Sequence, residues 1–228
     1  MNQRGIIIAL YINNILVFRK DEKSINATKT KLKAFHPMKD SGLVKKILGI
    51  RVAWHKDRIS LDQEVYAEQI LEEFRMGDSK PQKLPLSPSI NLNEDSPRLT
   101  RELYSEYRHV IGWLTYLAGG TRPDLQKLVN RLSQYLTDPT EVHYKAIKHI
   151  LRYLRGTIEY SISYEKGSND KLVGYSDAAY GNSVKQRSTS GYVFILVSGL
   201  VSWSSRKQPI TATLLLEAEY IAAADAAK

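Results

Sequence analysis

The hydrophobic pattern changes its period at Gly156, and this change constrains the fold more than any other feature of the sequence. Between residues 101 and 156, apolar residues recur at the three- and four-residue spacing of amphipathic helices. Beyond Gly156, four segments alternate with the period of two that is typical of strands, at residues 160–164, 171–176, 191–197 and 200–204. A final helix is expected over residues 214–227. The sequence therefore predicts an α+β fold with a domain boundary near Gly156.

The first 75 residues predict two β-hairpins, each followed by a helix. The hairpins are expected at residues 6–18 and 44–61, and the helices at residues 24–36 and 63–74. Prolines then interrupt the pattern, because proline lacks the backbone donor that helices and sheets require. The predicted division of the chain is a first domain, a proline-rich linker, a helical domain and a β-then-α domain, at residues 1–77, 78–100, 101–156 and 157–228.

The helix expected near residue 140 carries two further signals. In the sequence DPTE, Asp138 can cap the helix, Pro139 suits its first position and Glu141 can reach back to the cap. Basic residues also share one face of this helix, at Lys145, Lys148, Arg152 and Arg155. Such a stripe can follow a phosphate backbone, but taken alone it is more typical of the solvated side of an amphipathic helix.

The net charge of +9 is distributed unevenly along the chain. Residues 157–228 contain 7 basic and 7 acidic residues, whereas residues 1–156 contain 26 basic and 17 acidic residues. A basic part beside a neutral part is consistent with a surface for nucleic acid, and equally with a basic protein that has no such partner.

The sequence excludes cysteine chemistry and predicts neither a membrane span nor a secretory signal. The absence of cysteine excludes disulfides and cysteine-based zinc sites. An apolar run of roughly 18 residues, which a membrane span requires, is absent, and a secretory signal is not expected. We therefore expect a cytoplasmic or nuclear location. The five histidines lack metal-ligand spacing and are expected to be structural.

Two adjacent asparagines interrupt the first apolar hairpin, in the sequence ALYINNILVF. Asparagine is a poor strand residue and a good turn residue, so a tight turn is predicted at Asn13 and Asn14. The usual pair in such a turn is Asn-Gly or Asp-Gly, because its central residues often need a positive φ.

Three stretches, taken in order, are similar to one family. LYINNILVF resembles the strand-turn-strand that carries Tyr-Val-Asp-Asp in reverse transcriptases. GYSDAAYGNSVKQRSTSGYVFILVSGLVSWSSRKQP, followed by EAEYIA, resembles the ribonuclease H segment of copia-type long-terminal-repeat retrotransposon polyproteins. The stretch between them, from YRHVIGWLTYLAGG to HILRYLRGT, resembles the helical connection of the same polyproteins.

The resemblance implies that Asn13 and Asn14 stand where an active polymerase has two aspartates. Those carboxylates would bind magnesium, which activates the primer hydroxyl and stabilises the triphosphate. An asparagine fills the turn but supplies no negative charge. We therefore expect a degenerate polymerase site, with the remainder of the palm lying before Met1.

The resemblance also implies a ribonuclease H site, in which carboxylates hold two magnesium ions. Asp177 corresponds to the family's first aspartate, and Glu219 to its glutamate, so these two residues are the predicted catalytic and metal-binding pair. Glu217 is expected to point away, because residues two apart on a helix are about 200° apart. The family's later aspartate would lie beyond Lys228, so this domain is expected to be truncated and magnesium binding weak.

The leading interpretation is a fragment of a retrotransposon Pol polyprotein without catalytic activity. It would comprise the end of a reverse transcriptase palm and the start of a thumb, a helical connection and a truncated ribonuclease H-like domain. One alternative is a non-catalytic module that binds DNA or an RNA–DNA hybrid, with the basic helix as its contact surface. The other is a nuclease that becomes active when another chain completes its carboxylate set.

Overall fold

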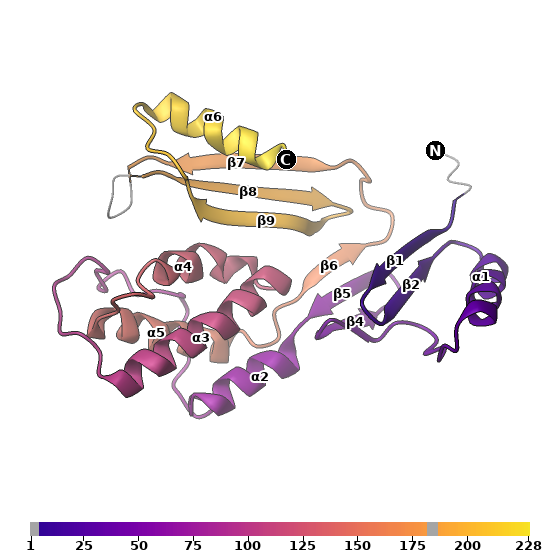
Figure 1. Cartoon of the computed structure of the whole chain (residues 1–228), viewed down its shortest axis with the longest axis horizontal. Coiled ribbons are helices and arrows are strands. Elements are labelled where there is room, and N and C mark those ends of the chain that lie inside the picture. The colour runs from indigo at the N-terminus through magenta and orange to yellow at the C-terminus, as the bar shows by residue number, and fades with distance from the viewer. Residues whose placement is uncertain (1–4, 182–186) are drawn as a thin grey trace. The chain divides into compact units, whose positions relative to one another are not determined.

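A computed structural model describes residues 5–181 and 187–228, and the chain divides into two compact units (Figure 1). The first unit is residues 1–48 and the second is residues 49–228. Each unit is mixed α and β, and its strands pair in antiparallel fashion, so the predicted α+β class is confirmed.

The first unit is a two-stranded hairpin followed by a helix. Strands β1 (Ile7–Tyr11) and β2 (Asn14–Phe18) pair so that Tyr11 faces Asn14, and helix α1 (Glu22–Phe35) and the short strand β3 (Lys46–Ile47) follow. Asp21 caps α1, because its carboxylate accepts a 2.8 Å hydrogen bond from the Ser24 backbone. Hydrogen bonding by Ser24 lowers the pKa of Asp21 to about 2. Helix α1 contains no buried residue.

The predicted turn at Asn13-Asn14 is wrong by one residue. The two turn residues are Ile12 and Asn13, and Asn14 is already the first residue of β2. Ile12 has a φ of 49°, in the left-handed region that β-branched residues rarely occupy. The hairpin therefore places a strained isoleucine where sequence reasoning expected an asparagine.

The second unit contains a helical bundle next to a sheet. The sheet comprises β4 (Ile50–Trp54), β5 (Arg58–Asp62) and β6 (Ile162–Glu165), with β5 in the middle. The helices are α2 (Glu64–Glu73), α3 (Arg101–Gly120), α4 (Pro123–Ser133) and α5 (Glu141–Gly156). Strand β6 follows Gly156, yet it pairs with β5 of the preceding segment, so the change of period is not a change of compact unit.

The hydrophobic core of the second unit lies among these helices. Each helix contributes the apolar stripe that its 3.6-residue period predicts. The fully buried side chains include Ile70, Tyr107, Leu114, Leu117, Leu125, Leu132, Ile147, Ile150, Leu151 and Leu154. The proline-rich stretch also contributes, because Leu92 is 1% exposed within the same core.

The predicted start of α5 is wrong in its details. The cap is Thr140, whose backbone N–H donates to Nδ1 of His143 at 3.0 Å. Asp138 instead forms an exposed ion pair with Arg98. His143 is buried, its Nε2 lies 3.0 Å from the carbonyl oxygen of Leu92, and burial lowers its pKa. This histidine is structural, as its lack of metal-ligand spacing predicted.

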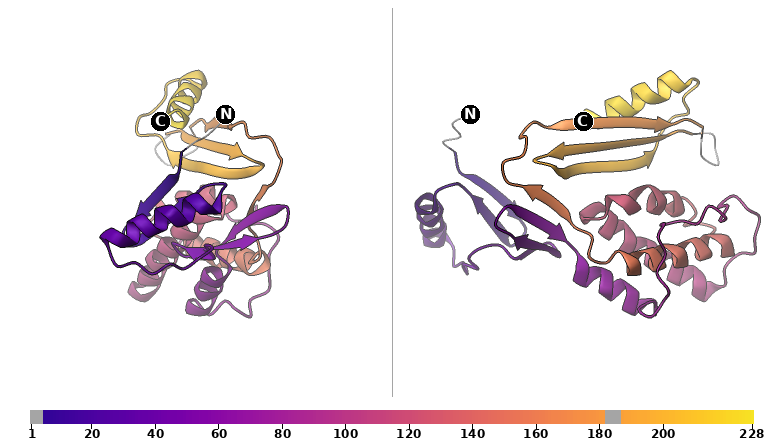
Figure 2. Two further views of the ribbon diagram at one scale, coloured as in Figure 1. Left: turned by 90° about the vertical axis from the view of Figure 1, so that its right-hand side faces the viewer. Right: turned by 180° about the vertical axis from the view of Figure 1, so that it is seen from behind.

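A second sheet and one helix complete the second unit. Strands β7 (Val173–Ala179), β8 (Thr189–Leu196) and β9 (Gly199–Lys207) pair in that order, and α6 (Leu215–Ala226) packs on β7 and β8. Figures 1 and 2 show α6 along one face of this sheet. Among the described residues, none of the helices is both long and apolar enough to cross a membrane.

Candidate functional site

The tip of the β1–β2 hairpin carries two neutral amides. Asn13 occupies the turn and Asn14 opens β2, and both are exposed. An amide oxygen can contribute to a cation site, but it cannot supply the negative charge that a hard divalent ion favours. The hairpin tip can therefore present polar groups to a ligand without binding a catalytic metal strongly.

Asp177 lies in β7, and its neighbours show which face of the sheet it occupies. Ala178 is buried against Ala218 and Ala222 of α6. Successive side chains of a strand point to opposite faces, so Asp177 points away from the α6 side, together with Tyr175. Asp177 is exposed on that other face.

Glu217 and Glu219 lie on the two sides of the α6 face that contacts the sheet, each about 100° around the helix from Ala218. The carboxylate of Glu217 accepts hydrogen bonds from the Thr213 backbone at 2.6 Å and from its hydroxyl at 2.7 Å. These hydrogen bonds lower the pKa of Glu217 and hold its carboxylate at the start of α6. The pairing of Glu219 with Asp177 stays a prediction, and it would require Glu219 to reach around β7.

The described residues do not fit a two-magnesium site. Within residues 5–181 and 187–228, the structure contains no group of three or more acidic or histidine side chains that could hold a metal ion. Asp177 and Glu219 supply two carboxylates from different faces of one sheet, and Asn13 and Asn14 supply none. Two-metal catalysis needs ligands that converge on both ions, so no reaction step is assigned to these residues.

The basic stripe of α5 is largely engaged with its own chain. Lys148 forms a 3.0 Å ion pair with Glu106 of α3, and hydrogen bonds from Tyr144 and Lys148 outweigh burial and lower the pKa of Glu106. Nε of Arg152 donates to the Lys80 carbonyl at 2.8 Å. Nε of Arg155 donates to the Gly77 carbonyl at 2.6 Å.

The proline-rich stretch runs along α5 and is fastened to both of its ends. Gly77 and Lys80 bind the C-terminal half, as described, and His149 contacts the Leu84 carbonyl at 3.0 Å. At the other end, the Glu141 backbone donates to the Pro97 carbonyl at 2.9 Å. Arg152 and Arg155 therefore hold residues 77–98 against α5 through hydrogen bonds. Of the four basic residues, only Lys145 is exposed with no interaction among the described residues.

The first unit accounts for most of the chain's net charge, which the sequence analysis did not show because it compared the charge on either side of Gly156. Residues 1–48 contain 10 basic and 3 acidic residues, a net charge of +7 out of the total of +9. Lys29 and Lys33 pair with Asp40. Lys20, Lys23 and Lys31 are exposed and form no ion pair within the described part of the chain.

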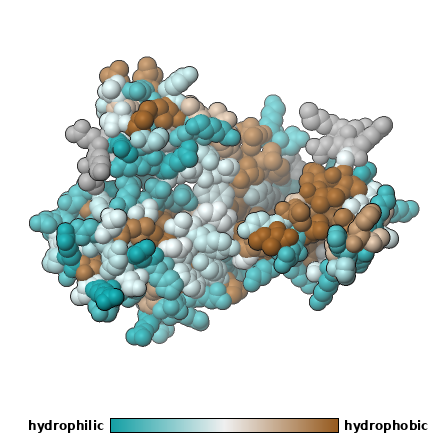
Figure 3. All heavy atoms as spheres, viewed as in Figure 1, coloured by the Kyte–Doolittle hydropathy of each residue, from teal (hydrophilic) through white to brown (hydrophobic). Residues whose placement is uncertain are grey.

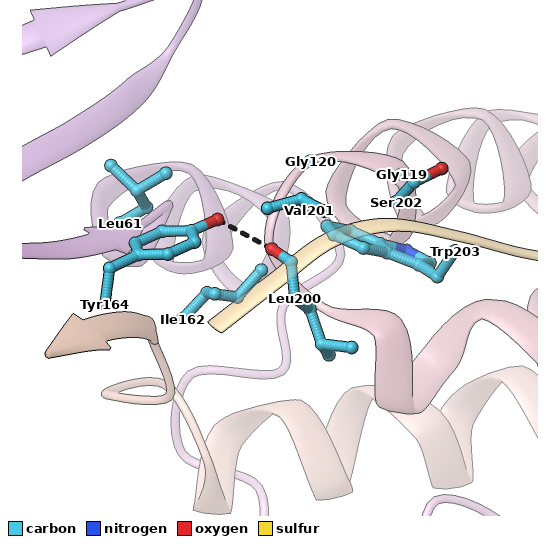
Figure 4. A pocket seen from close by; sticks show the side chains of 9 residues that line it. All are labelled: Leu61, Gly119, Gly120, Ile162, Tyr164, Leu200, Val201, Ser202 and Trp203. Atoms are coloured by element: carbon cyan, nitrogen blue, oxygen red, sulfur yellow. Dashed lines mark hydrogen bonds between the residues drawn. The ribbon is translucent and has the colours of Figure 1, made fainter. Parts of the chain in front are cut away.

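A cavity of about 330 Å³ lies between the end of α3, strands β5 and β6, and strand β9 (Figure 4). Tyr164 Oη donates to the Leu200 carbonyl at 2.6 Å, and Trp203 Nε1 donates to the Ala118 carbonyl at 2.9 Å. The cavity walls contain no carboxylate, imidazole or amine, and are formed by Leu61, Gly119, Gly120, Ile162, Tyr164, Leu200, Val201, Ser202 and Trp203. The cavity therefore lies between two sheets, with walls formed by apolar, glycine, serine, tyrosine and tryptophan residues.

Comparisons with known proteins identify relatives of the chain. Residues 1–88 match the family model described as reverse transcriptase (RNA-dependent DNA polymerase). The chain is 36% identical to the retrovirus-related Pol polyprotein from transposon TNT 1-94 of Nicotiana tabacum, over 98% of this chain but only 17% of that polyprotein. No solved structure matches the chain.

Two shorter relatives are matched over most of their own length. An uncharacterized mitochondrial protein of Arabidopsis thaliana is 33% identical, over 95% of this chain and 90% of that protein. A putative transposon Ty5-1 protein of Saccharomyces cerevisiae is 32% identical, over 96% of this chain and 72% of that protein.

Proposed function

The chain belongs to the family of copia-type retrotransposon Pol polyproteins, and we propose that it is a segment of Pol that contacts nucleic acid without polymerase chemistry of its own. The observation that carries this proposal is the hairpin tip, where Asn13 and Asn14 place neutral amides in the position that two aspartates occupy in the motif it resembles. The segment would include the end of the palm, the helical connection and the start of a ribonuclease H-like domain.

The first test is primer extension by the purified chain on an RNA template, with magnesium or manganese. We expect no template-dependent extension, because the hairpin tip lacks the carboxylates that hold the catalytic cation. An active reverse transcriptase on the same template serves as the control for the assay. Extension that depends on the template and is absent from a mock purification would overturn the proposal.

Charge supports nucleic acid as the partner and the first unit as the main contact. Reverse transcriptases act on nucleic acid, and the +7 charge of residues 1–48 is concentrated in less than a quarter of the chain. Lysines without an intramolecular ion pair are available to phosphates, and each phosphate contact releases condensed counterions. Helix α5 contributes less in this proposal, because Lys148, Arg152 and Arg155 are held by their own chain.

The second test measures affinity for a duplex at several salt concentrations. Replacing Lys20, Lys23 and Lys31 by glutamine should reduce the slope of log affinity against log salt by about 0.9 for each lost duplex DNA contact. The loss should be similar for all sequences, because phosphate contacts position a protein without specifying bases. The same salt series with an RNA–DNA hybrid tests whether the three lysines also contact that duplex.

Lys145→Gln is the matched variant for the basic stripe, because replacing Arg152 or Arg155 would also release residues 77–98 from α5. We expect Lys145→Gln to leave the salt slope almost unchanged. If the salt slope falls for Lys145→Gln but not for the triple lysine variant, the nucleic-acid contact surface lies on α5 and not on the first unit. Absence of binding at low salt would overturn the nucleic-acid part of the proposal and leave the primer-extension result unaffected.

A further inference from the structure

Helix α6 is apolar on the face that it presents to solvent as well as on the face that contacts the sheet. Ala218 and Ala222 are fully buried on the inner face. On the outer face, Leu216 is 79% exposed and Tyr220 is 78% exposed. A helix that is hydrophobic all round is normally buried, so this outer face is suited to a partner. Figure 3 shows hydrophobic residues at the surface over the start of α6.

The outer face forms a regular seam with large residues at one end and small residues at the other. Leu216, Tyr220, Ala223 and Ala227 are spaced by four, three and four residues, which is the spacing that holds a stripe against a second helix. The first two side chains are large and the last two are methyl groups. Two such seams fit together when they run in opposite directions, because each large residue then faces a small one.

We propose that α6 pairs in antiparallel fashion with α6 of a second copy of this chain. In this arrangement Leu216 faces Ala227 of the other copy, and Tyr220 faces Ala223. The same patch is used by both copies, as a two-fold interface requires. A parallel arrangement would place Leu216 against Leu216 and Ala227 against Ala227, which leaves one end crowded and the other end open.

Charge is complementary in the antiparallel arrangement. Glu217 and Lys228 are eleven residues apart, which is about 20° around the helix, so they lie on the same side of the seam. The two-fold axis brings that side of one helix against the same side of the other, with opposite ends in contact. Glu217 of each copy therefore lies near Lys228 of the other, whose side chain is 75% exposed although its ammonium also pairs with Asp225 of its own helix at 3.3 Å. The opposed helix dipoles favour the same orientation.

The inner face of α6 is held firmly, so the seam is presented in one orientation. Nε2 of the fully buried Gln208 donates to the Ala218 carbonyl at 2.9 Å and contacts Oγ of Ser190 at 3.0 Å. Arg206 of β9 forms a 2.9 Å ion pair with Asp225. The entropy lost when two helices pair is smaller when each helix is already fixed to its sheet.

The mass of the full chain in solution provides the first test. Sedimentation equilibrium should give a dimer for the wild-type chain and a dissociation constant raised roughly 30-fold or more for Tyr220→Glu, as expected for a hot-spot residue. Leu172→Glu is the matched control, since Leu172 is 60% exposed outside α6, and it should leave the mass unchanged. A monomeric wild-type chain would overturn the proposal. It would do so even if a different protein covers the seam, because the proposal names a second copy of this chain as the partner.

Exchange of the large and small residues tests the antiparallel fit. Leu216→Ala and Ala227→Leu should each weaken the dimer, whereas the double variant should restore it, because the large-to-small contact is re-formed with the roles exchanged. These positions are exposed, so circular dichroism should show the same helix content in all variants. A double variant that is weaker than both single variants would contradict the pairing.

Disulfide trapping tests the direction, and the chain suits it because it has no native cysteine. A mixture of the Leu216→Cys chain and the Ala227→Cys chain should form a crosslinked dimer on mild oxidation. The Leu216→Cys chain alone should not, because two copies of residue 216 are about 16 Å apart along an antiparallel pair. Crosslinking of Leu216→Cys alone would show a parallel pair and overturn the proposal.

Discussion

Replacing Arg122 by alanine should lower the free energy of unfolding of the second unit by about 3 kcal/mol, the lower end of the range for breaking a buried charge pair, because the Asp124 side chain is 31% exposed. The Arg122 side chain is 3% exposed. It donates to Asp124 at 2.7 Å through Nη2, and it also donates to the Thr157 carbonyl at 2.9 Å and the Thr157 hydroxyl at 2.7 Å. The guanidinium also lies 5.1 Å from the centre of the Tyr160 ring.

These contacts tie the start of α4 to the end of α5. Without the guanidinium, the Thr157 carbonyl loses a partner and Asp124 keeps only the hydroxyl of Tyr153, at 2.9 Å. A carboxylate left without its counter-charge in a partly buried site is costly. Arg122→Lys should recover only part of the loss, because an ammonium cannot contact Asp124 and Thr157 with the geometry of a planar fork.

Urea unfolding monitored by circular dichroism measures this effect, and Arg131→Ala provides the control. Arg131 is in the same helix and is exposed, so its removal should change the free energy of unfolding by less than about 0.5 kcal/mol. If Arg122→Ala unfolds at the same urea concentration as Arg131→Ala, the network around Arg122 contributes no net stability.

The helices were predictable because each buries a stripe that its own sequence carries. The helical spacing between residues 101 and 156 is borne out by α3, at Arg101–Gly120, and by the two helices that follow it, and the helix expected at residues 214–227 is α6, at Leu215–Ala226. Apolar residues at i, i+3, i+4 and i+7 specify a helix and its buried face without reference to distant parts of the chain. The α+β class follows from the same periodicity.

The details at the ends of elements depended on distant residues and could not be predicted. Thr140 caps α5 in place of Asp138 because His143 is locked between Thr140 and the Leu92 carbonyl, which lies in a stretch that reads as a linker. The turn of the first hairpin lies at Ile12-Asn13, since Tyr11 pairs with Asn14, so the turn preference of asparagine was not sufficient to predict the strand register.

The candidate site was predictable as a set of residue types and less so as an arrangement. Lys145, Lys148, Arg152 and Arg155 do lie on α5, but a helical wheel does not reveal that residues 77–98 occupy part of that face. Asp177 does lie in a strand, but the face on which it lies depends on Ala178 packing against α6. Polar groups on a wheel are indistinguishable until their tertiary partners are known.

Two glycine-to-alanine substitutions should change stability in opposite directions. Gly199→Ala should destabilise the second unit by roughly 1–3 kcal/mol, the usual range for an overpacked site. A Cβ at Gly199 would overlap Cδ1 of Tyr164 and would lie 2.7 Å from the carbonyl oxygen of Ser163. The ring cannot move aside freely, because its hydroxyl is bonded to the Leu200 carbonyl, and the Ser163 oxygen is backbone.

Gly112→Ala should instead stabilise the same unit by roughly 0.5–1 kcal/mol. Gly112 lies on the exposed side of α3, and a Cβ there would meet nothing within 4 Å. Alanine reduces the conformational freedom of the unfolded chain at no cost in packing, so the gain arises mainly in the unfolded state. The two variants add the same single methyl group, and they therefore separate local packing from the general effect of replacing glycine.

Thermal or urea unfolding tests whether the Tyr164 ring causes the loss of stability in Gly199→Ala. The measurement compares Gly199→Ala, Gly112→Ala and the double variant Gly199→Ala with Tyr164→Ala. Tyr164→Ala removes the obstructing ring, so Gly199→Ala should cost less in that background, and the difference is the interaction energy of a double-mutant cycle. The remaining cost reports the contact with the Ser163 carbonyl, which no side-chain change relieves. If Gly199→Ala costs the same with and without the Tyr164 ring, the close approach of β9 to β6 is limited by backbone contacts alone, and Tyr164 does not determine the need for glycine.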